Sequence, residues 1–175
     1  LKLFFCMLLA TISIYSSTNG ALCWMLMIPV FILTGNSMPF FRKWRVITIW
    51  IAVAALTLFI YFYGYHNPPG YPTPFTGFEQ PLDALRYFFG ILGNPFRIIH
   101  SLNHIIMVGA VLFSIFMLLV AYVFRYYKDK QLIRNSVVWI MTGFYSICTG
   151  ALVMVGRLPF GVYQSLSSRY TSFTL

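Results

Sequence analysis

Long apolar stretches without a single charge alternate along this chain with short clusters of basic residues. Three of these stretches cover residues 46–65, 105–124 and 136–156. A helix needs about 17–25 mostly apolar residues to cross the hydrocarbon core of a bilayer. Each stretch meets that length, so the pattern predicts a protein that crosses a membrane several times.

Two shorter apolar segments precede these stretches, on either side of the polar turn 16–20. We expect them to form a helical hairpin, with a re-entrant pair as the alternative because each is shorter than a full span. Pro29 is expected to kink the second one. The predicted fold class is all-α, a polytopic transmembrane helical bundle that forms a single membrane domain. One interfacial amphipathic helix is expected beside about five membrane segments. These segments are predicted near residues 3–15, 21–38, 46–63, 104–124 and 136–155.

The connection 64–103 is longer than topology requires. Aromatic residues at 61–65 are typical of a membrane–water interface, and the prolines and glycines that follow them exclude a regular helix. From Pro81 to Leu92 the pattern changes to an amphipathic helix, in which Asp83 and Arg86 can pair at i,i+3. Asn94 and Pro95 are then expected to start a new helix that continues into the fourth membrane segment. The expected apolar stripe of the amphipathic helix consists of Leu82, Leu85, Phe89 and Leu92.

Composition agrees with a lipid environment. Hydrophobic residues make up 59% of the chain and charged residues 9%, whereas a soluble domain carries about 25% charged residues. The chain begins at Leu1 and ends on the apolar start of a further segment at 170–175, so we expect a fragment or a processed product. The cysteines Cys6, Cys23 and Cys148 lie in apolar runs and share no metal-ligand spacing. We therefore expect small core residues there, and neither a metal nor a cofactor.

The net charge of +9 is concentrated in short segments beside the apolar runs. Membrane topology explains such charge better than binding to nucleic acid does. We therefore predict membrane lipids, and no nucleic acid, as partners. The basic clusters at 42–45 and 125–134 are separated by two predicted spans and therefore fall on one side. The positive-inside rule places both clusters and Lys2 in the cytoplasm. The regions 16–20, 64–103 and 156–170 then face outward. We therefore predict a multi-pass protein of the cell membrane, which in a bacterium is the inner membrane.

Outward-facing charges are the candidates for binding chemistry. Arg97, His100 and His104 are spaced at i, i+3 and i+7, and a cation there could hold the phosphate of a lipid-linked substrate. The alternative is that Arg97 snorkels to lipid headgroups while the histidines fill an interface. A two-histidine metal site would lack a nearby acid, so none is predicted. Arg157 and Arg169 flank the last outward loop, where they could bind an anion or anchor the chain at the interface.

Glu79 and Asp83 are the outward carboxylates and the candidates for a catalytic base. A local role is the alternative for each, because Asp83 has Arg86 as a partner and both lie near a helix start. No charge lies at the centre of a predicted span, which argues against a proton-coupled transporter without excluding one. The residues leave open whether the chain is an enzyme.

The last part of the chain carries a distinctive arrangement of glycine, arginine and tyrosine: Gly156-Arg157, Phe160-Gly161 and Ser168-Arg169-Tyr170-Thr171. Together with the aromatic run 61–65 and Leu-Gly-Asn-Pro-Phe at 92–96, it resembles a family of uncharacterised bacterial polytopic membrane proteins, over roughly two thirds of the chain. The layout of that family is similar to that of membrane glycosyltransferases and polysaccharide-assembly proteins. The resemblance implies envelope polysaccharide or lipid-linked sugar handling, with an isoprenoid-phosphate-linked glycan as partner and Arg157 and Arg169 as the first positions to examine. It also implies that the acid typical of such enzymes belongs to an early outward loop. A transporter or channel subunit and a non-catalytic membrane scaffold are the alternatives.

Overall fold

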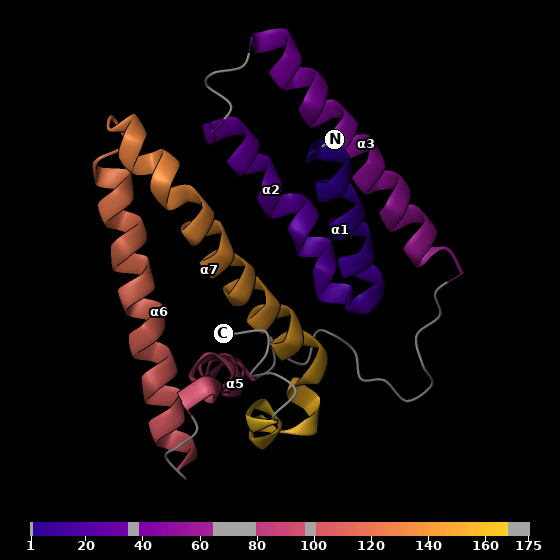
Figure 1. The fold of residues 1–175 in the computed structure, drawn as a ribbon. Coiled ribbons are helices and arrows are strands. Elements are labelled where there is room, and N and C mark those ends of the chain that lie inside the picture. Colours follow the sequence, from indigo (N-terminus) through magenta and orange to yellow (C-terminus); the bar gives the residue numbers. More distant parts are fainter. Residues whose placement is uncertain (1, 35–38, 65–79, 97–100, 168–175) are drawn as a thin grey trace. The chain divides into compact units, whose positions relative to one another are not determined.

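The computed structural model describes residues 2–34, 39–64, 80–96 and 101–167, and every regular element in these ranges is a helix. The prediction of an all-α fold is confirmed. The chain divides into two compact units, the first covering 1–68 and 129–141 and the second 69–128 and 142–175. Figure 1 labels the elements in chain order: α1 (Lys2–Ser16), η1 (Thr18–Gly20), α2 (Ala21–Thr34), α3 (Phe40–Phe62), α5 (Pro81–Gly93), η3 (Asn94–Phe96), α6 (Leu102–Arg125), α7 (Lys130–Arg157), η4 (Leu158–Phe160) and η5 (Val162–Leu166).

Within the described ranges, three helices are long and apolar enough to cross a membrane, namely α3, α6 and α7. They contain 23, 24 and 28 residues, which gives lengths of about 35–42 Å against a hydrocarbon core of about 30 Å. The helices α1 and α2 are apolar but contain only 15 and 14 residues. The described part of the chain is therefore a helical membrane protein with three full-length candidate spans, fewer than the five segments predicted.

The first unit contains α1, α2, α3 and the first part of α7, up to residue 141 (Figure 1). As predicted, α1 and α2 form a helical hairpin, and η1 connects them. The hairpin is tight because Gly20 has no side chain, and a Cβ at that position would collide with the backbone of Ser13. The core of the unit consists of Ala10, Trp24 and Trp50, one residue from each of the three helices.

Tryptophan contacts determine how α2 and α3 pack in this unit. The indole Nε1–H of Trp50 donates a 2.8 Å hydrogen bond to the carbonyl oxygen of Trp24, and the two rings lie 4.6 Å apart. Pro29 lies within α2 and leaves the carbonyl one helical turn earlier, that of Met25, without its usual backbone donor. Trp50 thus anchors α3 on the stretch of α2 that proline weakens.

Two helices begin earlier than the charge pattern predicted. The prediction began them at residues 46 and 136, but α3 begins at Phe40 and α7 at Lys130. Both basic clusters therefore extend into helical turns rather than lying wholly in loops. The side chain of Asp129 explains the early start of α7, because its Oδ1 accepts hydrogen bonds of 3.0 Å from the backbone N–H groups of Gln131 and Leu132. At the start of α3, the ammonium of Lys43 donates to the carbonyl of Ile32 near the end of α2, where a positive charge is favourable.

In the second unit, α5 packs against α6, against the second half of α7 and against η5. The helix itself confirms the prediction for 81–92, and it packs within the protein through a face other than the expected apolar stripe. Its buried residues include Ala84, Tyr87 and Ile91, whereas Leu82 and Leu85 are 61% and 54% exposed. Large apolar residues lie on both faces of α5, and the face that carries small residues is the one that approaches its neighbours. That face packs against Leu158, Val153 and Met154 of the segment 153–158.

The helices α5 and α6 cross (Figure 1), and the crossing depends on two glycines. A Cβ at Gly93 would collide with the carbonyl oxygen of Ile105, and a Cβ at Gly109 would collide with that of Phe89. The two backbones are therefore in direct contact, as in small-residue packing between membrane helices. Gly109 follows the start of α6 by seven residues, or about 10 Å along the helix axis.

The expectation that a single helix runs from Asn94 into the fourth segment is wrong. Residues Asn94–Phe96 form one 3-10 turn, and Ser101 before α6 has an extended backbone, with φ −96° and ψ 127°. Pro95 in this turn has no backbone N–H with which to continue α5, and the extended backbone of Ser101 separates the turn from α6. The chain thus breaks between α5 and α6, close to where the two helices cross.

Candidate functional site

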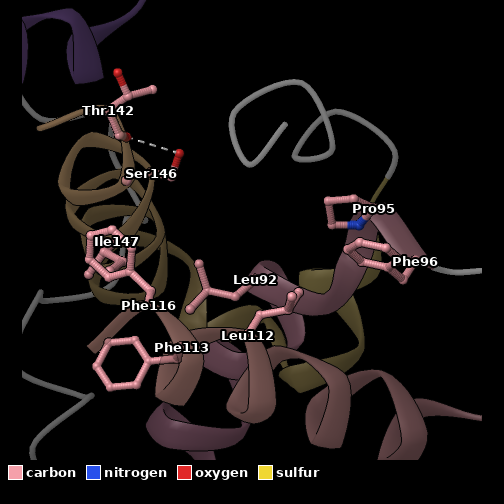
Figure 2. A pocket seen from close by; sticks show the side chains of 10 residues that line it. Leu92, Pro95, Phe96, Leu112, Phe113, Phe116, Thr142, Ser146 and Ile147 are labelled. Carbon is pink, nitrogen blue, oxygen red and sulfur yellow. Dashed lines mark hydrogen bonds between the residues drawn. The ribbon is translucent and has the colours of Figure 1, made fainter. Parts of the chain in front are cut away.

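A groove of about 350 Å³ in the second unit is a candidate binding site (Figure 2). Volumes of about 300–1,000 Å³ are typical of sites for small ligands. We call it the α6–α7 groove, because residues of these two helices form most of its walls. On the remaining side it is closed by the end of α5 and by the turn that follows, through Leu92, Pro95 and Phe96. The wall from α6 consists of Leu112, Phe113 and Phe116.

The α7 wall of the groove contains Thr142, Gly143, Ser146 and Ile147. The Ser146 hydroxyl donates a 3.4 Å hydrogen bond to the carbonyl of Thr142, one turn earlier (Figure 2). A Cβ at Gly143 would collide with the ring of Phe116, so glycine brings that ring close to α7. None of the ten lining residues is charged. The groove is thus a largely hydrocarbon surface with two hydroxyl groups on one side.

Thr142, Ser146 and Gly150 form a row of small residues spaced four apart on α7, a pattern typical of close contact between membrane helices, and the structure divides that row. A Cβ on Gly150 would lie 3.6 Å from the Phe88 ring and 3.7 Å from Ile91 of α5, which confirms a helix contact there. Thr142 and Ser146 line the groove instead. One face of α7 therefore both contacts α5 and lines the α6–α7 groove.

Buried polar atoms lie next to α5 in the same unit. The Asn94 side chain is fully buried, and its Nδ2 donates a 3.0 Å hydrogen bond to the carbonyl of Ser167. Among the described residues, no hydrogen-bond partner reaches the Asn94 Oδ1, the Thr149 Oγ1 or the Ser165 Oγ. A buried polar atom without a partner is costly, so these positions are where a water molecule or a polar ligand group would be stabilised.

The structure describes three of the seven predicted site residues. Asp83 pairs with Arg86 at 3.4 Å on the exposed side of α5. This ion pair is the local role that the sequence pattern indicated as the alternative to catalysis. His104 is exposed in the first turn of α6. Arg157 is half-buried at the end of α7, with its guanidinium 5.8 Å from the centre of the Phe160 ring. Outside the described residues lie Glu79, Arg97, His100 and Arg169.

The continuous helix predicted to carry Arg97, His100 and His104 is interrupted at Ser101, and Arg97 and His100 lie outside the described residues. A shared face requires continuous helix, and the extended backbone at Ser101 interrupts it. His104 therefore belongs to α6 alone. The groove itself was not predicted, because its residues come from four elements whose sequence positions share no spacing.

No family model matches this chain, and neither does any curated protein or solved structure. The site must therefore be interpreted from its own residues.

Proposed function

We propose that this protein handles a lipid-linked sugar in the inner membrane of a bacterium, with an isoprenoid-phosphate-linked glycan as its partner. In this proposal the chain crosses the cell membrane several times. The basic clusters at 42–45 and 125–134 face the cytoplasm, and the end of α7 faces outward. The rule that basic residues concentrate in cytoplasmic segments supports this orientation.

The placement of Arg157 is the observation that carries the proposal. It ends the candidate span α7, and its guanidinium stacks near the Phe160 ring, which lies in the following 3-10 turn. Arginine is suited to phosphate because its planar fork of N–H donors matches the phosphate oxygens, and an aromatic ring restricts the motion of that fork. A substrate phosphate at the membrane surface would meet a partly ordered cation there. Arg97 and Arg169 are further cations proposed for the same anion.

Replacing Arg157 with alanine in the complete protein is expected to reduce surface glycan at least about tenfold. A hydrogen bond to a charged group contributes about 1.5–3 kcal/mol, and 1.4 kcal/mol corresponds to a factor of ten in binding. Lysine at this position keeps the charge but loses the fork, so Arg157→Lys is expected to give an intermediate level. The measurement is surface glycan per molecule of membrane-inserted protein.

Arg134→Ala is the matched control, because Arg134 is an exposed arginine near the opposite end of the same helix. It is expected to leave the glycan level within about twofold of the unchanged protein, since the proposal places it on the cytoplasmic side. Equal glycan in the Arg157→Ala and Arg134→Ala variants, at equal protein levels, would contradict the proposal.

A transporter subunit is the second candidate, favoured by the broken backbone between α5 and α6. Transporters place interrupted helices next to their substrate sites, and the 3-10 turn Asn94–Phe96 borders the α6–α7 groove. Solute flux into liposomes that contain the purified protein, with no requirement for Arg157, would favour this candidate over lipid-linked sugar handling.

A further inference from the structure

Three cations lie in the first two turns of the candidate span α3, and no acidic residue accompanies them in these turns. Lys43 already donates to the carbonyl oxygen of Ile32. Arg42 and Arg45 are exposed, and among the described residues neither side chain has an ion-pair or hydrogen-bond partner. We call Arg42 and Arg45 the arginine pair. These two cations are therefore available to a partner outside the chain.

The two arginines lie on one face of α3. Residues three apart in an α-helix have Cβ atoms about 5–6 Å from each other, so the arginine pair holds two positive charges side by side. Arg42 also lies in the first turn of the helix, where the backbone dipole is positive. These like charges repel one another, and one anion bound by both guanidinium groups would offset that repulsion.

The described acids of the chain do not supply that anion. The chain contains three acidic residues against twelve basic ones. Asp83 pairs with Arg86, and the carboxylate of Asp129 accepts hydrogen bonds from two backbone N–H groups at the start of α7. The third acid, Glu79, lies outside the described residues. Charge complementarity thus points to an anion from outside the chain.

Aromatic residues indicate the depth at which the arginine pair lies. Phe40, Phe41 and Trp44 are 68%, 85% and 53% exposed, and the rings of Phe40 and Trp44 lie 6.0 Å apart. The charge-free run of α3 then begins at Val46. Tryptophan next to an apolar span is typical of the headgroup region of a bilayer. The anion available at this depth is the phosphate of a phospholipid.

The cations favour a headgroup with a net negative charge. Phosphatidylcholine also contains a phosphate, but its choline cation would lie beside three protein cations. Phosphatidylglycerol presents the same phosphodiester without a cation, and the planar fork of each guanidinium matches the phosphate oxygens. We infer that the arginine pair binds the phosphate of an anionic phospholipid. The inference goes beyond the proposed function and does not depend on it.

Native mass spectrometry of the complete protein, released from detergent micelles, measures the binding of individual phospholipids. Phosphatidylglycerol and phosphatidylcholine with the same palmitoyl and oleoyl chains isolate the effect of the headgroup. A basic residue near an anionic membrane surface contributes a factor of about five in binding. We therefore expect phosphatidylglycerol to bind at least about tenfold more tightly than phosphatidylcholine.

The double variant Arg42→Gln/Arg45→Gln removes both charges and keeps side chains that favour a helix. It is expected to bind phosphatidylglycerol at least about tenfold more weakly than the unchanged protein. Arg42→Lys/Arg45→Lys keeps the charges without the planar forks, and its affinity is expected to be intermediate. Arg86→Gln is the matched control, because it removes an exposed arginine that already pairs with Asp83. It is expected to change the affinity less than about twofold.

Thermal unfolding in detergent gives a second measurement. Without lipid, the double glutamine variant is expected to be as stable as the unchanged protein or slightly more stable, because like charges leave the start of α3. Phosphatidylglycerol at about 100 times its Kd is expected to raise the Tm of the unchanged protein by about 5–10 °C, and that of the variant by about half as much or less. Inorganic phosphate is expected to raise neither Tm, which separates a lipid headgroup from a free anion.

Three results would overturn the inference. The first is equal affinity of the unchanged protein for phosphatidylglycerol and phosphatidylcholine. The second is equal phosphatidylglycerol binding by the double glutamine variant and by Arg86→Gln. The third is a rise in Tm with inorganic phosphate as large as the rise with phosphatidylglycerol. Polyglutamate that binds through the arginine pair, while the two phospholipids bind equally, would assign the pair to an acidic protein segment and would also overturn the inference.

Discussion

Replacing Gly109 with alanine is expected to lower the free energy of unfolding by about 2–3 kcal/mol, which corresponds to a fall in Tm of about 5–10 °C for a chain of this size. The new Cβ would collide with the carbonyl oxygen of Phe89 and would lie 2.9 Å from the backbone nitrogen of Gly93. Both obstacles are backbone atoms, so neither can rotate away as a side chain could. The helices α5 and α6 would have to separate, and the contacts along their crossing would be lost.

Gly156→Ala is the control for this prediction. Gly156 also lies in a helix, the last turn of α7, but nothing lies within 4 Å of a Cβ built there. Alanine is favoured over glycine within a helix by about 1 kcal/mol, so this variant is expected to be neutral or slightly more stable. Thermal unfolding in a mild detergent, followed by circular dichroism at 222 nm, compares the two variants. Equal Tm values for both would show that α5 and α6 do not meet at Gly109.

Trp50→Ala is expected to have a comparable or larger effect, a loss of about 3–5 kcal/mol. The Trp50 side chain is 1% exposed, donates to the Trp24 carbonyl and contacts the Phe31 ring at 5.1 Å between centroids. In lipid, little hydrophobic driving force holds helices together, so lost packing contacts and a lost hydrogen bond account for the cost. Trp50→Phe keeps a ring but removes the donor, and is expected to cost about 1 kcal/mol.

Trp139→Ala separates the specific contacts of Trp50 from the general effect of removing a tryptophan. Trp139 is 77% exposed on α7, so its loss is expected to change stability by less than about 1 kcal/mol. Equilibrium unfolding of detergent-solubilised protein measures all three variants. A Trp50→Ala variant as stable as Trp139→Ala would contradict the packing of α2 on α3.

The sequence was most informative where physical chemistry acts locally. Runs without charge predicted the helices now labelled α3, α6 and α7, because in hydrocarbon every backbone N–H and C=O must be satisfied within its own helix. The beginnings of α3 and α7 were misplaced because a helix can continue beyond the hydrocarbon into the headgroups, where Lys130 and Arg134 are tolerated. In the sequence pattern, Asp129 was treated as one charge within a basic cluster. It could have been identified as the N-cap of α7.

Tertiary contacts were beyond the reach of periodicity. In α5, leucines lie on one face and tyrosine and isoleucine on the other, and only the positions of its neighbours decide which face packs within the protein. Gly90 and Gly93 were an available indication of the packed face, because small residues mark close approach between membrane helices. The α6–α7 groove brings together residues of α5, η3, α6 and α7, and local spacing does not predict how these elements pack.

Single-cysteine accessibility is the most direct test of the central claim that this chain is a multi-pass membrane protein whose basic clusters share the cytoplasmic side. Lys128→Cys and Thr73→Cys would be introduced separately after Cys6, Cys23 and Cys148 have been replaced by alanine. A membrane-impermeant maleimide added to intact cells is predicted to label Thr73→Cys and not Lys128→Cys, and inverted membrane vesicles are predicted to show the reverse. Labelling of both cysteines from the same side would contradict the orientation, and with it the outward placement of Arg157.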